Sequence, residues 1–332
     1  MKFGSTPSDR SVGKILGHNV AGLNGKRALS KGKVLTSEDI DILLEIGRIN
    51  IYVAELEPDD IDENSAAQKI ASAAIGAGIT MTRPNVGGVA LKSKWLGVLR
   101  VDQKALTRLN QFEEIGFASL PTNRVVKPKQ SIAKVKIIPF AISNRVLEEA
   151  ESAALGNPLI YVDQLSPRKV SLILTGSSTI KDRLRESFEP ALRTRIENLG
   201  SRIGNVEFVS ADGQQEENLL AEELLRQVDI GADLILLAGE TAIMDRNDIA
   251  PRAVEAVGGT VVSLGAPVEP GNLLMLADLK DTPILGVPGC ARSPKANVVD
   301  WLLPRLLAGE QMTRADIVAL GYGGFLHNYK EL

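Results

Sequence analysis

Short apolar runs and longer amphipathic stretches alternate through the second half of the chain. The apolar runs have the length and composition of buried strands, and the amphipathic stretches repeat their apolar residues at helical spacing. Strands are predicted at residues 170–174, 206–209, 233–238, 260–264 and 283–287, and helices at 180–199, 214–228, 248–257 and from Pro294 onward. This alternation predicts an α/β fold, a three-layer α/β/α domain on a mostly parallel sheet. We assign residues 168–332 to this domain and expect its ligand beyond the carboxyl ends of the strands.

The first half of the chain is less regular. A helix is predicted to start at Thr36-Ser37-Glu38-Asp39, where a hydroxyl can cap the first amides and acids follow at the positive end of the dipole. Residues 49–56 have the pattern of a strand, 66–75 that of a helix, and 95–101 and 132–140 those of strands. Because Gly and Pro interrupt residues 80–140, we expect a β-rich segment there. Residues 1–160 are therefore predicted to form a smaller β-rich α+β region, with the junction near 156–167.

Composition narrows the class of protein. The chain of 332 residues is 44% hydrophobic and 24% charged, which is ordinary for a globular protein with an apolar core. Its net charge of −3 gives no general attraction to nucleic acid or to anionic membranes. One cysteine cannot form an internal disulfide, and two histidines leave little for a metal cluster. No apolar run reaches the roughly 18–20 residues that span a bilayer, and residues 1–7 lack a signal-peptide core, so we expect a cytoplasmic protein.

One basic stretch raises the question of nucleic acid. Its cations are interleaved with Val and Ile, as on the solvated face of strands: Arg124, Lys127, Lys129, Lys134 and Lys136. No aromatic stacking platform accompanies them, so we expect no nucleic-acid partner. The net charge of −3 gives no reason to expect a membrane partner either.

The first strand of the α/β domain ends in Thr175-Gly176-Ser177-Ser178, directly before a helix. Glycine lets a ligand approach the backbone, and hydroxyls beside the free amides of a helix start suit a phosphate. The same residues also make an ordinary turn with a helix cap. They predict a phosphate site only in combination with other loops.

A second loop follows the third strand and contains Gly239, Glu240 and Thr241, with Asp245 and Asp248 downstream. Two carboxylates just beyond a strand end can hold Mg²⁺ or orient a water molecule. Asp245 and Asp248 are therefore the candidate catalytic and metal-binding residues. The alternative is that Asp248 only caps the next helix.

A third loop, Pro288-Gly289-Cys290-Ala291-Arg292-Ser293, follows the last strand. Ser293 is predicted to cap a helix whose first residue is Pro294. A guanidinium such as that of Arg292, beside free helix amides, suits a phosphate or carboxylate, although a solvated basic turn is the alternative. Cys290 could touch the ligand, but a lone cysteine is more often a packed residue. A stiff turn, Pro270-Gly271-Asn272, can wall a pocket or serve as scaffold.

In their order along the chain these loops resemble the molybdopterin-binding domain shared by molybdopterin adenylyltransferases and molybdenum-insertion enzymes. That family has a Thr-Gly turn with an acid, a Gly-Gly-Val-Ser/Thr loop with a downstream Asp, a Pro-Gly-Lys-Pro turn and a Leu-Pro-Gly-Asn-Pro-Val-Ser loop. The matching residues are, in the same order, Thr175-Gly176-Ser177-Ser178, Ala238-Gly239-Glu240-Thr241 with Asp245 or Asp248, Pro270-Gly271-Asn272, and Val287-Pro288-Gly289-Cys290-Ala291-Arg292-Ser293. The resemblance covers residues 168–310. Residues 29–35, with the helix and strand after them, resemble a segment that insertion enzymes place before this domain.

The resemblance implies that these loops bind molybdopterin, with Mg²⁺ near the downstream Asp. We also expect a homo-oligomer. Two departures from the family pattern stand out: Ser177 and Ser178 replace the acid of the first loop, and Asn272 replaces a Lys. Binding therefore carries over better than catalysis. Arg292 is hypothesised to restore part of the lost positive charge.

Two functions of different classes follow. The first is binding of molybdopterin or its nucleotide-linked form in molybdenum cofactor biosynthesis or maturation; as an enzyme, the protein would form or cleave the phosphoanhydride of that adduct, or insert molybdate. The alternative is a non-catalytic carrier or sensor that acts with a partner nucleotidyltransferase or molybdoenzyme, and the missing acid favours it. An unrelated nucleotide-dependent enzyme is disfavoured, because the sequence has neither a Walker loop nor Gly-x-Gly-x-x-Gly after a strand.

Overall fold

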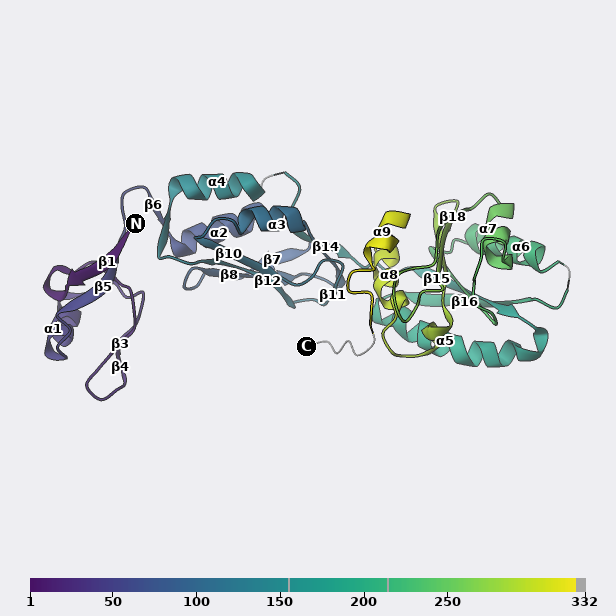
Figure 1. Cartoon of the computed structure of the whole chain (residues 1–332), viewed down its shortest axis with the longest axis horizontal. Helices are drawn as coiled ribbons and strands as arrows, with labels where there is room; N and C mark the ends of the chain where they lie inside the picture. Colours follow the sequence, from purple (N-terminus) through teal and green to yellow (C-terminus); the bar gives the residue numbers. More distant parts are fainter. Residues whose placement is uncertain (155, 214, 327–332) are drawn as a thin grey trace. The chain divides into compact units, whose positions relative to one another are not determined.

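The computed structural model describes residues 1–154, 156–213 and 215–326, and it divides into two compact units. Unit 1 comprises Met1–Lys94 and Leu99–Val162, and unit 2 comprises Trp95–Val98 and Asp163–Leu332. Most of the helices and many of the strands of both units are labelled in Figure 1.

Short strands and four helices precede residue 165 in the described part of the chain. In chain order the elements are β1 (Lys2–Pro7), a 3-10 turn at Ser8–Arg10, β2 (Ile15–Leu16), β3 (Val20–Ala21), β4 (Arg27–Leu29), α1 (Ser37–Glu45), β5 (Asn50–Glu55), β6 (Asp60–Asp62), α2 (Glu63–Ala74), β7 (Ile79–Met81), β8 (Gly88–Ser93), β9 (Gly97–Val101), α3 (Gln103–Leu109), β10 (Ile115–Ser119), β11 (Val125–Val126), β12 (Ser131–Ile137), β13 (Ala141–Ser143), α4 (Asn144–Ala154) and β14 (Ile160–Gln164).

The predicted β-rich segment is confirmed. An antiparallel sheet of order β10-β12-β8-β7 occupies much of residues 79–137, and α2 packs on β8 and β12. Helices α3 and α4 were not predicted. The helix predicted to start at Thr36 is confirmed as α1, over a core that includes Leu16, Leu35 and Leu43.

Asp39 and Thr36 cap the start of α1. Its side chain accepts hydrogen bonds from the Thr36 backbone N–H at 3.0 Å and from the Lys33 ammonium at 2.5 Å, while the Thr36 hydroxyl accepts from the Asp39 N–H. Burial raises the pKa of this carboxyl, but the hydrogen bonds from Lys33 and Thr36 outweigh burial and lower the pKa below its ordinary value. The carboxylate therefore stabilises the folded state above about pH 3.8, and this contribution is lost as the pH falls through the lower folded-state pKa.

We expect Asp39→Asn to lower the free energy of opening of α1 by about 1–3 kcal/mol at pH 7, because a buried charged acceptor is replaced by a neutral amide. Amide hydrogen exchange of residues 37–45 measures this opening. The difference between variant and wild type should shrink when both proteins are compared below pH 3.8. An equal difference at both pH values would contradict the role of the charge.

Unit 2 contains the alternating elements that the sequence predicts. In chain order they are β15 (Lys169–Gly176), a 3-10 turn at Ser178–Ile180, α5 (Lys181–Asn198), β16 (Arg202–Ser210), α6 (Glu216–Asp229), β17 (Leu234–Gly239), α7 (Ile249–Ala256), β18 (Thr260–Leu264), β19 (Met275–Leu279), β20 (Thr282–Gly286), a 3-10 turn at Gly289–Arg292, α8 (Val298–Leu307) and α9 (Arg314–Ala319).

The strands of unit 2 form one six-stranded sheet of order β16-β15-β17-β20-β19-β18. β16, β15, β17 and β20 are parallel neighbours, and β19 is antiparallel to both β20 and β18. Helix α5 packs on β15 and β16, and α6 and α7 lie on the opposite side of the sheet (Figure 1). The predicted three-layer α/β fold with a mostly parallel sheet is confirmed.

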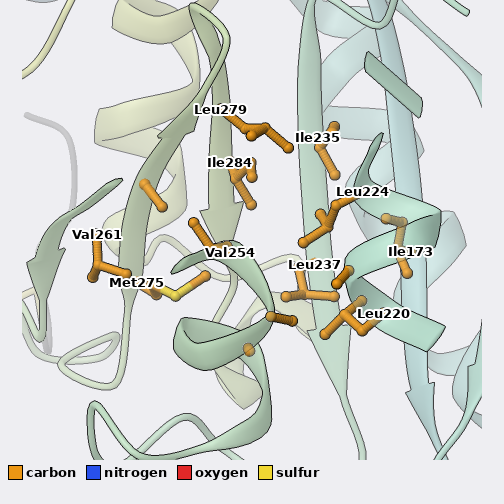
Figure 2. Packing of buried hydrophobic residues seen from close by; sticks show 14 of the residues in the cluster. Ile173, Leu220, Leu224, Ile235, Leu237, Val254, Val261, Met275, Leu279 and Ile284 are labelled. Atoms are coloured by element: carbon orange, nitrogen blue, oxygen red, sulfur yellow. The ribbon is translucent and has the colours of Figure 1, made fainter. Parts of the chain in front are cut away.

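Buried aliphatic side chains join α6 and α7 to the sheet (Figure 2). Leu220 and Leu224 of α6 and Val254 of α7 face Leu237 and Ile284 of the strands, and none of the five is more than 2% exposed. With aromatics only 4% of the chain, Leu, Ile and Val fill this core, as the composition requires. Burial of this kind is the main force that holds two helices on one face of a sheet.

Two features of unit 2 differ from the sequence prediction. Strand β19 was not predicted, and the last long helix starts at Val298 rather than at Pro294. The helix start is set by Asn297, whose side chain accepts from the Val299 N–H at 3.0 Å while Asp300 accepts from the Asn297 N–H at 2.9 Å. Ser293 is therefore no helix cap, and its hydroxyl accepts from the Lys295 N–H at 3.2 Å within the loop. Among the described helices, none is long and apolar enough to cross a membrane.

Candidate functional site

The loops singled out in the sequence leave the sheet at one edge. The strand register pairs Thr175 with Gly239, Leu237 with Gly286, and Gly286 with Met275, which follows the turn at 270–272. The four loops that resemble the family motifs therefore all adjoin the carboxyl ends of the parallel strands, where they are neighbours along the sheet. The chain passes from β15 to β16 on one side and to β17 on the other, and this reversal of strand order is where open α/β sheets bind ligands.

A cavity of about 230 Å³ opens at this edge between the starts of α6 and α7. Its floor is apolar and includes Leu220 and Leu237, and its rim carries hydroxyls and carboxylates. The lining residues are Thr175, Gly176, Val209, Ser210, Ala211, Glu216, Leu220, Leu237, Gly239, Glu240, Thr241, Ala242, Ile243, Asp248, Ile249, Ala250 and Val287. An apolar pocket with a few convergent polar groups is the usual form of a small-molecule site.

Helix starts contribute backbone donors to this cavity. Helices α1, α2, α3, α8 and α9 each begin with a side chain that accepts from a first-turn N–H, whereas among the described residues α5, α6 and α7 begin without one. Glu216 and Ile249, the first residues of α6 and α7, both line the cavity. The N–H groups of an uncapped first turn are available to acceptors on a ligand.

Carboxylates already occupy the amides of the first loop. The Ser177 N–H donates to Glu240 Oε2 at 2.9 Å, and the Ser178 N–H donates to Asp212 Oδ2 at 2.7 Å. Hydrogen bonds from Ser178 and Ser210 hold the pKa of Asp212 below its ordinary value. Two acids from other loops thus stand where the sequence predicts phosphate contacts.

The two candidate catalytic carboxylates differ in position. Asp248 lines the cavity, and its Oδ2 accepts from the backbone N–H groups of Met244 at 2.6 Å and Asp245 at 2.9 Å. Asp245 is exposed and does not line the cavity; hydrogen bonds from the backbone and side chain of Asn247 lower its pKa. In the part of the chain that the structure describes, no three Asp, Glu, His or Cys side chains are grouped to hold a metal ion.

The third loop is held from beneath by Arg195 of α5. This buried guanidinium donates to the carbonyls of Ala291, Ser293 and Lys295 and to the Asp300 carboxylate. Arg292 lies over the Phe188 ring, with its Cζ 4.5 Å from the ring centroid.

Of the third loop and its preceding strand, only Val287 lines the cavity. Pro288, Gly289, Cys290, Arg292 and Ser293 do not. Cys290 is half-buried, and burial raises the pKa of its thiol.

The turn at 270–272 also lies apart from the cavity. Asn272 lines a second hollow of about 310 Å³ with Ala266, Pro267, Val268, Glu269, Gly321, Gly324 and Phe325. Gly271 is required in this turn because its φ is +128° and a Cβ there would clash with the Val298 side chain. The turn therefore packs on the start of α8.

The structure thus brings together part of the predicted site. Thr175, Gly176, Gly239, Glu240, Thr241 and Asp248 share one cavity. Sequence reasoning missed Ser210 and Asp212 after β16, and Glu216 at the start of α6. The position of Ser210 at the end of a predicted parallel strand was the signal that could have found this third strand end.

Comparison with known proteins gives few matches in sequence. A family model described as "Domain of unknown function (DUF8806)" matches residues 5–55. None of the curated proteins compared matches the chain.

Several solved structures are similar to this chain at low TM-score. A molybdenum cofactor biosynthesis protein from Pyrococcus furiosus is 12% identical, with a TM-score of 0.26 over 93% of this chain and 64% of that one. The molybdopterin biosynthesis MoeA protein from Pyrococcus horikosii is 10% identical, with a TM-score of 0.30 over 93% and 75%. The molybdopterin biosynthesis Mog protein from Mycobacterium ulcerans is 18% identical, with a TM-score of 0.26 over 41% and 91%. This chain spans 64% of the length of the Pyrococcus furiosus protein. At TM-scores this low the similarity does not bear on function.

Proposed function

We propose that this protein binds molybdopterin or its nucleotide-linked form in the cavity at the carboxyl edge of the unit 2 sheet. One observation carries the proposal. Two loops of the motif series that resembles the molybdopterin-binding domain line one cavity where the strand order reverses, the first with Thr175 and Gly176 and the second with Gly239, Glu240 and Thr241. The apolar floor suits the flat pterin ring, and the uncapped starts of α6 and α7 supply donors for its carbonyl and ring-nitrogen acceptors.

Binding without turnover is the form of this function that the site favours. Asp248 and Asp245 accept hydrogen bonds from backbone amides, so each serves the loop that carries it. Among the described residues no three Asp, Glu, His or Cys side chains are grouped to hold a metal ion. A carrier or sensor releases no nucleotide monophosphate from an adenylylated molybdopterin, whereas an enzyme does.

Protein purified from a host that makes molybdopterin should carry the pterin. Oxidation converts released molybdopterin to a fluorescent product that chromatography can quantify against protein. We expect an amount that approaches one pterin per chain, and the same protein from a host unable to make molybdopterin should carry none. A protein that is folded and free of pterin from both hosts, even after addition of molybdopterin, would contradict the proposal.

A further inference from the structure

Glu240 lies across the first loop of the cavity. Its Oε2 accepts from the Ser177 N–H at 2.9 Å, although the two residues are 63 positions apart in the chain. Gly176 makes room for this contact, because a Cβ there would stand 3.0 Å from Glu240 Cβ and 3.1 Å from Oε2. The bond and the glycine together hold a carboxylate over the backbone donor that a phosphate would use.

The charged side chains that line the cavity are all acidic. Glu216, Glu240 and Asp248 are in its lining, and no Lys, Arg or His is among the described residues that form it. A phosphate at the Ser177 N–H would meet the Glu240 carboxylate, which already accepts from that N–H at 2.9 Å, and the two negative charges would repel each other. A bare phosphate is therefore poorly matched to this cavity.

A ring edge with paired N–H donors is well matched. A carboxylate has two oxygens with about four acceptor positions, and Ser177 takes one of them at Oε2. The amino-pyrimidinone edge of a pterin offers a ring N–H and an exocyclic amino N–H side by side, in the same geometry as a guanidine fork. Carboxylates bind such forks with two parallel hydrogen bonds.

We propose that Glu240 is the specificity-determining residue of the cavity: its carboxylate accepts the donor edge of the pterin ring and keeps bare phosphate away from the Ser177 amide. The inference rests on the proposed function in that the ring is a pterin. It also fixes the orientation of the bound molybdopterin: the donor edge of the pterin ring, and not the phosphate, lies beside Ser177.

Two probes of opposite character test the inference in the full-length protein. Unsubstituted pterin, which has no phosphate, is titrated by its fluorescence, and inorganic phosphate is titrated by ³¹P NMR. The variants are Glu240→Gln, which keeps an oxygen for Ser177, and Glu240→Ala, which removes it. Glu222→Gln is the matched control, because Glu222 is an exposed carboxylate on α6 outside the cavity lining. Glu240 is itself exposed, so all three variants should have the same melting temperature as the wild type.

The expected changes have opposite signs. Pterin affinity should fall by about tenfold or more in Glu240→Gln, since a charge-assisted bond becomes a neutral one. Phosphate affinity should rise from wild type to Glu240→Gln and again to Glu240→Ala, and Glu222→Gln should change neither. Equal pterin affinity in wild type and Glu240→Gln, or phosphate affinity that stays level or falls, would overturn the inference while leaving the proposed function intact. A wild-type protein that binds neither pterin nor molybdopterin would overturn both.

Discussion

Arg195→Ala should lower the free energy of unfolding of unit 2 by about 3 kcal/mol, the lower end of the range of about 3–5 kcal/mol for removal of one partner of a buried ion pair, because the Asp300 side chain is 34% exposed. Arg195 is 9% exposed and donates to Asp300 Oδ1 at 2.8 Å and to the Ser293 carbonyl at 2.7 Å. Without the guanidinium, that carbonyl and those of Ala291 and Lys295 lose a donor, and Asp300 loses its cation. The loop from Pro288 to Lys295 should then no longer be held in a single conformation.

The two tryptophans of the chain, Trp95 and Trp301, both belong to unit 2, so urea unfolding followed by their fluorescence measures its stability. Arg193→Ala is the control on the same helix. Its side chain is 35% exposed and pairs with Glu189, so its loss should cost about 1 kcal/mol or less. Equal losses in the two variants would show that Arg195 is not the anchor of the third loop.

Phe188→Ala should cost unit 2 about 3–5 kcal/mol, the range for truncation of a buried aromatic side chain. Phe188 is among the largest fully buried side chains of the described chain, and it is 1% exposed. Truncation leaves a cavity beneath α5 that close-packed neighbours cannot fill. It also removes the ring over which Arg292 lies. Arg292 should then become more mobile.

The same fluorescence-detected unfolding measures this effect. Phe188→Leu keeps most of the apolar volume and should cost only about 1–2 kcal/mol. Arg292→Ala in the wild-type background isolates the cation–π contact, which is worth about 0.5–1 kcal/mol when partly exposed. If Phe188→Ala cost no more than Arg292→Ala, the side chain could not be a main support of α5.

The α/β fold could be predicted because buried parallel strands are short apolar runs and their crossover helices are long and periodic. Strand β19 escaped prediction because its hairpin to β20 turns at Lys280-Asp281, both with positive φ. Such turns are usually marked by Asn-Gly or Asp-Gly, and here that mark is missing. The start of α8 was misplaced because Ser293-Pro294 and Asn297–Asp300 are both capping signals, and contacts from distant Arg195 fix the first as loop.

The site was only half predictable for a similar reason. Sequence order places Thr175, Gly176 and Gly239 at strand ends, and parallel strands bring their ends to one edge. No local pattern says that Glu240 and Asp212 would take the amides of Ser177 and Ser178, because these bonds join residues 63 and 34 positions apart. The acid that is missing from the first loop is thus matched in space by carboxylates from two others.

A pair of substitutions in one loop tests most directly whether the cavity is the molybdopterin site. Ala242 is exposed and lines the cavity, and Met244 is 66% exposed in the same loop without lining it. Because both positions are exposed, tryptophan at either should leave the core intact, and we expect only the Ala242→Trp side chain, which starts from the cavity lining, to fill the cavity. After purification from a molybdopterin-producing host, Ala242→Trp should carry at least about tenfold less pterin than wild type, since a filled pocket cannot bury the ring, and Met244→Trp should match wild type. Equal pterin content in the two variants would contradict the assignment of molybdopterin to this cavity.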